Sequence, residues 1–253
     1  MDTAIFMKKR WLCMAASLLI CICAGVGYAW SVLQTPIIAT HHWPDTQVSL
    51  TYTITVLCST MAPLLFGSVI GRMKTRTCIL LGAALFGGGL FLTGWMHGGV
   101  WQLYLFYGIL SGLGTGFIYP TLMAYVVRLF PDRAGMASGL GTAAYGSGAI
   151  IWAPVASALI EGGSLRIAFC ALGAGFFAVI VLCSLLLREP PEGFVASLRT
   201  AGTGAAQHGS VQLRRKEMVK TLPFYLMVVI FTCGLVAGVI VISQASPILQ
   251  SAE

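Results

Sequence analysis

Few side chains in this sequence are placed where they could carry out covalent chemistry. Ser138 and Ser147 both stand among glycines, an arrangement worth testing for the nucleophile of a membrane serine protease. Such an enzyme also needs a histidine base inside a later helix. The four histidines all lie outside the apolar runs of the chain, at His41, His42, His97 and His208. We therefore predict that the protein is not an enzyme.

Metal and cofactor binding find no support in the pattern either. The histidines show no metal-ligand spacing. A free cysteine behaves as a small hydrophobe, and no CxxC pair occurs in the sequence. The last apolar run has no lysine that could hold a retinal. The eight cysteines lie within or at the ends of apolar runs: Cys13, Cys21, Cys23, Cys58, Cys78, Cys170, Cys183 and Cys233. We expect no metal and no cofactor.

Neutral polar side chains are the better candidates for a binding site. Groups of this kind are costly against lipid, so they should face neighbouring helices or a wet cavity. Hydroxyls on membrane helices also bond the carbonyl four residues earlier, so cavity lining and helix packing both stay open. No acidic or basic residue lies deep inside an apolar run, which predicts a neutral, aromatic, hydroxyl-lined site. The candidates for the substrate cavity are Tyr28, Ser31, Gln34, Thr55, Tyr119 and Tyr145.

The composition defines the class of protein that must position these groups. Only 9% of the residues are charged and 57% are hydrophobic, whereas soluble domains carry about 25% charged residues. These values exclude a disordered chain and an ordinary cytosolic enzyme. The net charge of +7 comes from basic residues that are too scattered for a nucleic-acid surface. We predict an all-α membrane protein that contacts lipid and binds no nucleic acid.

Seven apolar runs are long enough to cross a bilayer. A spanning helix needs about 20 mostly apolar residues, and none of the runs alternates like a membrane β-strand. The predicted helices are Trp11–Ile38, Thr46–Ile70, Thr77–Met96, Trp101–Val127, Ala134–Ile160, Leu165–Leu187 and Leu222–Ser246. This spacing predicts a six-helix bundle over residues 1–187, a linker over 188–221, and a seventh membrane helix with a short external tail over 222–253.

The basic residues predict the orientation of these helices. Of the 15 lysines and arginines, all but Arg166 fall before the first run or in the segments after the second, fourth and sixth runs. Cytoplasmic loops carry the excess of basic residues. We therefore expect a cytoplasmic amino terminus, a cytoplasmic linker, and contacts between the basic residues and anionic lipid.

Glycines at four-residue spacing form a second pattern. Gly108, Gly112 and Gly116 lie in the fourth run, and Gly135 and Gly139 lie in the fifth. Small residues at this spacing let two helix backbones approach closely. We expect both sets to pack helices together; smooth faces that slide during transport are the alternative use.

The loop after the second run resembles a known signature. The segment Gly67-Ser-Val-Ile-Gly71-Arg72-Met-Lys74-Thr-Arg76 is similar to the Gly-x-x-x-Asp-Arg-x-Gly-Arg-Arg motif of the major facilitator superfamily. In that fold two six-helix halves pack around a central cavity. The resemblance implies a cytoplasmic gate loop comprising Gly67, Gly71, Arg72 and Arg76. Gly71 replaces the usual acid and Lys74 replaces the second glycine, so the usual acid–arginine latch is not expected in its standard form.

Further segments resemble the oxalate/formate antiporter family, which includes monocarboxylate carriers. These segments are Gly25–Leu33, Gly112–Pro120, Leu129–Gly139 and Arg188–Phe194. The resemblance implies alternating-access transport of a small carboxylate such as oxalate, formate, lactate or pyruvate across the cell's inner membrane. A counter-anion or a proton is the implied second transported species.

The resemblance also places parts of the substrate site. Tyr28 and Tyr119 match aromatic cavity positions of the family, whereas the cations that neutralise its substrate lie in helices of the second half, for which this sequence has no counterpart. We therefore expect a chain truncated after its seventh helix. The alternative is a non-transporting helix bundle that needs a partner chain or has lost its function.

Overall fold

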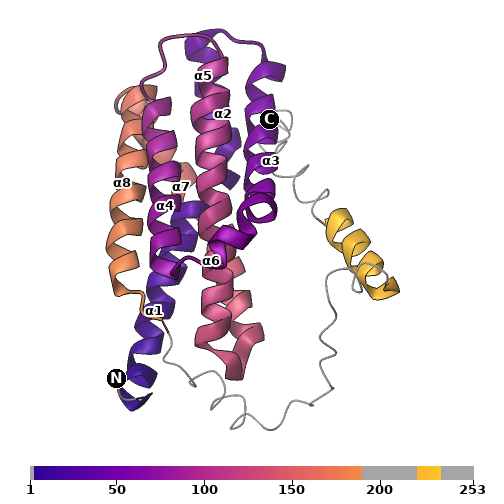
Figure 1. The fold of residues 1–253 in the computed structure, drawn as a ribbon. Coiled ribbons are helices and arrows are strands. Elements are labelled where there is room, and N and C mark those ends of the chain that lie inside the picture. Colours follow the sequence, from indigo (N-terminus) through magenta and orange to yellow (C-terminus); the bar gives the residue numbers. More distant parts are fainter. Residues whose placement is uncertain (1–2, 190–220, 235–253) are drawn as a thin grey trace. The chain divides into compact units, whose positions relative to one another are not determined.

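The computed structural model describes residues 3–189 and 221–234 (Figure 1). The chain divides into two units, residues 1–201 and residues 202–253. Every regular element in the described ranges is a helix. The described part therefore confirms the predicted all-α architecture.

The first unit is a bundle of membrane-length helices. Three short elements join the longer ones: the 3₁₀ turns η1 and η3 and the π-helical segment η2. The elements are α1 (Thr3–Ala24), η1 (Gly25–Ala29), α2 (Trp30–His41), α3 (Asp45–Ile70), α4 (Thr75–Thr93), α5 (Trp101–Leu103), η2 (Tyr104–Ser111), α6 (Gly112–Leu129), η3 (Pro131–Arg133), α7 (Ala134–Glu161) and α8 (Leu165–Leu186).

These elements form six helices that are long and apolar enough to cross a membrane. We call α1, η1 and α2 together the first span, and α5, η2 and α6 together the fourth span. The six candidate spans are Lys9–His41, Asp45–Ser68, Thr75–Thr93, Trp101–Leu129, Pro131–Glu161 and Leu165–Leu186. The first six predicted helices are thus confirmed, with ends shifted by a few residues.

The predicted linker and the predicted seventh span can be compared only in part. Residues 190–220 lie outside the described residues, so the linker stays a prediction. A shorter apolar helix covers Leu222–Gly234, within the predicted Leu222–Ser246 run. The remaining residues of that run also lie outside the described part, so the seventh membrane crossing stays a prediction.

Two spans depart from plain α-helix, which the hydrophobic pattern did not predict. The first span narrows to a 3₁₀ turn at Gly25–Ala29, and the fourth span winds as a π-helix over Tyr104–Ser111. Glycine is a poor α-helix former, and the Gly25-Val-Gly27 sequence weakens the helix at this turn. Departures from α geometry inside helices are often found at functional sites.

The glycine stripe of the fourth span packs against α3. A Cβ atom added at Gly108 would lie 2.9 Å from Ile54 Cγ2, one at Gly112 would lie 2.8 Å from the Thr55 carbonyl oxygen, and one at Gly116 would lie 2.6 Å from the Ser59 carbonyl oxygen. Each of these glycines therefore lets the two helices approach closely, and this part of the packing prediction is confirmed.

The second glycine pair behaves differently. A Cβ added at Gly135 or at Gly139 would meet nothing within 4 Å in the described chain. Both residues are exposed on α7. Neither glycine packs against another helix of the described chain, because four-residue spacing marks a face of a helix without saying which way that face points. Packing against any other helix stays a prediction.

Burial is uneven among the spans. In the most apolar window of each span, 61% of the first span and 56% of the fourth is buried, against 17% for α3 and 11% for the span containing α7. On the other side of the bundle α4 packs between α6 and α8. The faces of α3 and α7 are thus the open side of the bundle.

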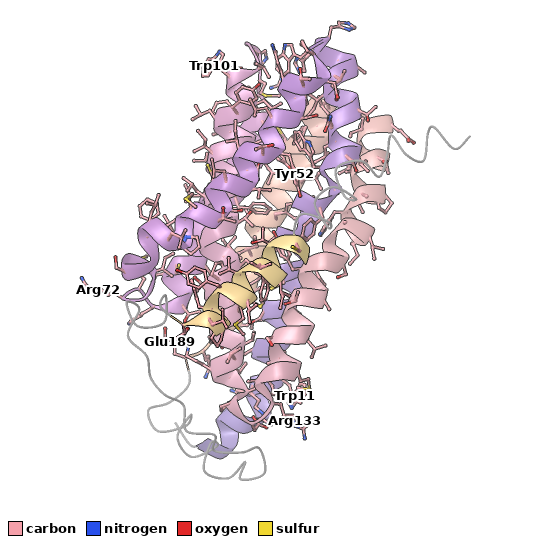
Figure 2. All side chains as sticks on the ribbon, turned by 90° about the vertical axis from the view of Figure 1, so that its right-hand side faces the viewer. Trp11, Tyr52, Arg72, Trp101, Arg133 and Glu189 are labelled. Atoms are coloured by element: carbon pink, nitrogen blue, oxygen red, sulfur yellow. The ribbon has the colours of Figure 1, made fainter. Side chains whose placement is uncertain are left out.

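The two ends of the bundle differ in charge. One end, which we call the basic end, carries the start of α1 and the loops after α3, α6 and α8. Figure 2 shows Arg72, Arg133 and Glu189 toward this end and Trp101 at the other end, which we call the opposite end. Arg166, at the start of α8, belongs to the opposite end.

Candidate functional site

Three tyrosines from three different spans meet in one cluster. The Tyr28 and Tyr145 rings have centroids 5.2 Å apart and stand nearly perpendicular, at 78°. The Tyr119 and Tyr145 rings lie 4.6 Å apart with an interplanar angle of 44°. We call Tyr28, Tyr119 and Tyr145 the tyrosine cluster; all three are half-buried. The sequence named these residues as cavity candidates, and the structure brings them together.

A close crossing of the first span and α7 positions the cluster. A Cβ at Gly25 would collide with the Tyr145 carbonyl oxygen, and one at Gly148 would lie 2.7 Å from the Gly25 Cα atom. The Trp152 Nε1–H donates to the Ile22 carbonyl oxygen at 3.0 Å across the same interface. Because both glycines lack a side chain, the backbones touch, and the Tyr145 ring reaches Tyr28.

A second aromatic group lies on the neighbouring residues of the first span. The Trp30 ring lies 4.6 Å from that of Tyr107 and stacks 6.5 Å from that of Tyr52. These three residues are buried. The sequence analysis missed them as site residues, although Trp30 follows Tyr28 by only two positions in a segment already singled out.

Two polar atoms beside this aromatic group are buried without a hydrogen-bond partner in the described chain. They are Trp30 Nε1 and Thr51 Oγ1. Buried polar groups in native proteins are nearly always paired. The wall formed by the first span and α3 therefore holds hydrogen-bonding capacity that the described residues do not use.

The other candidates have local partners or stand apart from the cluster. The Gln34 amide donates to Asp45 Oδ1 at 2.6 Å and to Ser49 Oγ at 2.8 Å, which ties α2 to α3 near the opposite end. The Thr55 hydroxyl donates to the Thr51 carbonyl oxygen at 2.9 Å within its own helix. Ser31 is half-buried on α2. The cluster itself thus consists of the three tyrosines alone.

The gate loop predicted from the motif lies between α3 and α4. Arg72 and Arg76 are exposed, and neither forms an ion pair with any residue in the described ranges. A Cβ at Gly67 would meet nothing within 4 Å, and one at Gly71 would meet only the Gly67 carbonyl oxygen, at 3.2 Å. The position where the motif usually has its acid is therefore open at the surface.

An acid reaches this loop from another part of the chain. The Thr75 backbone N–H donates to Glu189 Oε1 at 3.0 Å, and Arg128 Nη2 donates to the Thr75 hydroxyl at 3.3 Å. A carboxylate at the first turn of a helix satisfies free N–H groups and complements the helix dipole. Glu189 thus caps α4 from beyond the end of α8. The sequence analysis did not assign it this role, although it lies in the quoted Arg188–Phe194 segment.

A second link joins the start of α1 to the loop before α7. Arg10 Nη1 lies 3.2 Å from Asp132 Oδ1, and the Arg10 guanidinium sits 4.6 Å from the centroid of the Phe130 ring. The Trp11 ring meets the same Phe130 ring at 4.9 Å. Charged contacts that connect separate helices thus concentrate at the basic end of the bundle.

The arrangement is suited to holding a ligand. The described residues contain no group of three or more His, Cys, Asp or Glu side chains that could hold a metal ion. Tyrosine hydroxyls can donate hydrogen bonds to an anionic oxygen, and the rings offer apolar walls. Multi-pass helices, a neutral aromatic cluster between them and charged links at one end define the class: a membrane transport protein.

The comparisons with known proteins name the family. Residues 15–252 match the sequence profile of the Major Facilitator Superfamily. The chain belongs to this superfamily, so it is a multi-pass membrane protein of a transporter family and not an enzyme.

The chain resembles individual members of known function or name only at low sequence identity. The chain is 24% identical over 97% of its length to an uncharacterized MFS-type transporter, YhjX, of Escherichia coli. It is 26% identical over 94% of its length to the oxalate:formate antiporter of Oxalobacter formigenes, and 32% identical over 68% to monocarboxylate transporter 12 of Homo sapiens. It spans 59%, 55% and 31% of the lengths of these three relatives.

Proposed function

We propose that the protein is a secondary transporter of small carboxylates, of the oxalate, formate, lactate or pyruvate class, and that this chain supplies one half of it. The observation that carries the proposal is the tyrosine cluster, in which three spans each contribute one phenol. Two similarities support the substrate class, because one relative is named an oxalate:formate antiporter and another a monocarboxylate transporter.

The chemistry of the cluster fits one side of a carboxylate site. The rings of Tyr28 and Tyr119 both contact the Tyr145 ring. The three phenol groups can therefore offer hydroxyl donors and apolar ring faces to the same ligand. Hydrogen bonds from neutral donors orient a carboxylate but do not neutralise its charge. The proposal therefore assigns neutralisation to cations from a second six-helix half, with residues 188–221 as the linker and 222–253 as the start of that half.

Alternating access requires the two halves to rock about the site. In the proposal, the open faces of α3 and α7 receive the second half, and the links at the basic end hold the six helices together as one rigid body. Arg72 and Arg76 of the gate loop, exposed at that end, face the second half when the cytoplasmic side closes. A counter-anion or a proton is the second transported species.

The proposed orientation places the amino terminus in the cytoplasm, in a cell's inner membrane. The side chains of Arg10, Arg72, Arg128 and Arg133 belong to the basic end, and Arg166 belongs to the opposite end. Basic residues are retained on the cytoplasmic side of a membrane. The charge difference between the two ends supports this orientation.

Transport into proteoliposomes tests the proposal. The full open reading frame that contains this chain is purified, reconstituted into vesicles loaded with formate or oxalate, and assayed with radiolabelled oxalate, formate, lactate or pyruvate. We expect saturable uptake. Tyr28→Ala and Tyr119→Ala should each reduce it by about tenfold, the effect of losing one hydrogen bond to a charged group. Thr55→Ala should reduce it less, because its hydroxyl already bonds within α3.

Two further variants separate the hydroxyl from the ring. Tyr28→Phe and Tyr119→Phe keep the aromatic contacts with Tyr145 and remove only the donors. Uptake by these variants close to the alanine level assigns the effect to hydrogen bonding. Wild-type rates in all tyrosine variants would remove the cluster from the site. If the protein transports none of these small carboxylates, the alternative hypothesis, a non-transporting helix bundle, is favoured.

A further inference from the structure

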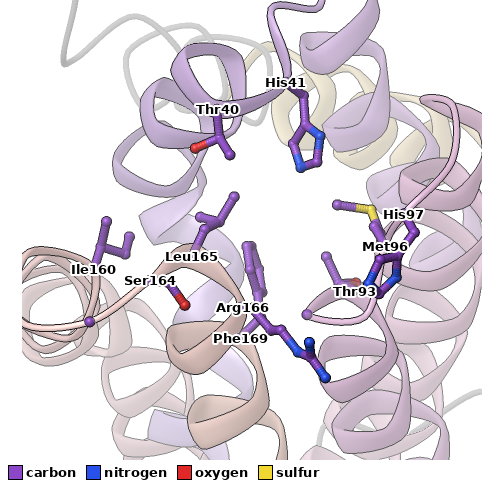
Figure 3. A pocket seen from close by; sticks show the side chains of 12 residues that line it. Thr40, His41, Thr93, Met96, His97, Ile160, Ser164, Leu165, Arg166 and Phe169 are labelled. Atoms are coloured by element: carbon purple, nitrogen blue, oxygen red, sulfur yellow. The ribbon is translucent and has the colours of Figure 1, made fainter.

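A pocket lies at the opposite end of the bundle, where no residue of the tyrosine cluster is found. Its volume is about 420 Å³, and its walls come from the ends of α2 and α4, the turn after α4, the end of α7 and the start of α8. Figure 3 shows His41 and Thr40 on the wall formed by α2, with His97 and Met96 across the pocket from Ser164.

The one permanent charge in the lining of this pocket is the positive charge of Arg166. Arg166, His41 and His97 line it, and no aspartate or glutamate does. Glu161 follows the lining residue Ile160 in the chain but is not itself part of the wall. Arg166 forms no ion pair with any residue in the described ranges. Among the residues that the structure describes, Arg166 is thus the one lysine or arginine at this end, and it lines a cavity with no counter-charge in its wall.

Trp95 holds two of these groups in place. The Arg166 guanidinium carbon lies 3.9 Å from the centroid of the Trp95 ring. His97 Nδ1 lies 2.6 Å from the Trp95 carbonyl oxygen. A guanidinium stacked on a ring keeps the N–H groups along its edge free for a bidentate acceptor. Arg166 and His97 therefore both contact Trp95, one through its ring and the other through its carbonyl oxygen.

The loop that carries His97 is itself braced. The Gln102 side-chain oxygen accepts from the backbone N–H groups of His97 at 3.2 Å and Gly98 at 2.9 Å. On the facing wall the Ser164 hydroxyl oxygen accepts from the Ile167 N–H at 3.3 Å, so the proton of that hydroxyl stays available. The pocket therefore has donors on two walls, together with the backbone N–H groups of Leu165 and Arg166 at the start of α8, which an α-helix leaves without an intrahelical partner.

We propose that this pocket binds an anionic oxygen group, a carboxylate or a phosphate, through Arg166, His97 and the start of α8. The site is separate from the tyrosine cluster and does not rest on the proposed transport activity. Two sources present this chemistry at a membrane surface: a free small anion in solution, and the phosphate of a lipid headgroup.

The contact of His97 with the Trp95 carbonyl oxygen decides which of its ring nitrogens can face an anion. A carbonyl oxygen only accepts, so the proton of neutral His97 sits on Nδ1, and its Nε2 is an acceptor that repels an anion. Protonation at Nε2 turns this atom into a donor and adds a positive charge. The other titratable or charged groups that line the pocket are Arg166, from α8, and His41, from α2. Burial lowers the pKa of His41 and so favours its neutral form.

Anion titrations of the purified chain in nanodiscs of neutral phosphatidylcholine test the site. Phosphate and oxalate are titrated, with tryptophan fluorescence and the thermal unfolding temperature as readouts. We expect saturable binding that Arg166→Gln weakens by about tenfold or more, as loss of a charge-assisted hydrogen bond would. His97→Gln should weaken binding less than Arg166→Gln does, because it removes no permanent charge from the lining.

Matched variants keep the result interpretable. Arg133→Gln removes an exposed arginine at the basic end and should bind like the wild type. Arg166→Lys keeps the charge but loses the planar fork, so it should lie between Arg166→Gln and the wild type. Retention of the wild-type thermal unfolding temperature without anion shows that each variant is folded.

Nanodiscs that contain phosphatidylglycerol separate the two sources. If the lipid headgroup occupies the pocket, the free anions bind more weakly in these discs, and a labelled phosphatidylglycerol is retained by the wild type and lost from Arg166→Gln. If a free anion is the ligand, the titrations are the same in both discs. Equal affinities for the wild type and Arg166→Gln in both kinds of disc, or absence of saturable binding to the wild type, would overturn the proposal.

Discussion

The bundle has two pairs of apolar helices, α4 with α8 and α3 with α7, that differ in how far they are buried. The spans containing α4 and α8 bury 50% and 39% of their most apolar windows, whereas those of α3 and α7 bury 17% and 11%. By mean hydropathy α3, α4 and the span containing α7 are equally apolar. The difference therefore comes from which residues face a neighbour, and apolar character alone does not reveal it.

Glycine placement accounts for much of this difference. Between α4 and α8, a Cβ at Gly87 would lie 2.9 Å from the Gly173 carbonyl oxygen, and one at Gly173 would lie 2.5 Å from the Phe91 nitrogen. On α7, by contrast, Gly135, Gly139 and Gly146 have open space around them. The same residue type joins one pair of helices and leaves a smooth free surface on another.

The largest effect should come from leucines on the two sides. Leu90 of α4 is 0% exposed and Leu64 of α3 is 73% exposed. We expect Leu90→Ala to lower the free energy of unfolding by about 2–5 kcal/mol, because it leaves a cavity. Leu64→Ala should change it by less than about 0.5 kcal/mol. Unfolding curves in detergent compare the two, and equal losses would contradict the assignment of α3 to the open side.

A pair of glycines on α7 sharpens the comparison within one helix. Gly148 touches the first span, since a Cβ there would lie 2.6 Å from the Ile22 carbonyl oxygen, whereas one at Gly146 would meet nothing within 4 Å. Gly148→Ala should cost about 1–3 kcal/mol through overpacking. Gly146→Ala should be neutral or slightly stabilising, because alanine is the better helix former. The measurement is the thermal unfolding temperature, and a neutral Gly148→Ala would show that the crossing is loose.

The smallest expected effect concerns the start of α4. Glu189→Ala removes the carboxylate that accepts from the Thr75 N–H, and a lost helix cap costs about 1 kcal/mol. Glu161→Ala, in an exposed acid at the end of α7, is the matched control and should be close to neutral. A Glu189→Ala protein as stable as the control would mean that the well-buried side of the bundle does not depend on this cap.

The sequence was sufficient for the spans because length and apolar character are local properties. Even so, the third helix ends at Thr93 and not at the predicted Met96, because Trp95 and Met96 are apolar residues of a turn that follows Gly94. Hydropathy does not distinguish apolar residues in such a turn from apolar residues in the last turn of a helix. The 3₁₀ and π segments leave the same hydrophobic pattern as an α-helix and were invisible for the same reason.

The site was only partly predictable, because its geometry depends on contacts between distant residues. Tyr28, Tyr119 and Tyr145 were identified by type, but nothing in the spacing said that their rings would meet. Thr55 was identified by the same reasoning, and its hydroxyl bonds within its own helix. The Glu189 cap on Thr75 joins positions 114 residues apart, a distance that no local pattern reports.

The π-helical segment of the fourth span has a consequence for the line along which its glycines lie. Four residues of an α-helix turn through slightly more than a full circle, so a stripe at that spacing drifts around the helix. A π segment winds more loosely, and four of its residues fall short of a full circle.

The step from Gly108 to Gly112 runs through η2, and the step from Gly112 to Gly116 runs through α6. The two drifts have opposite sense and largely cancel. The three glycines therefore lie in a nearly straight line along the fourth span, and α3 contacts them at successive turns.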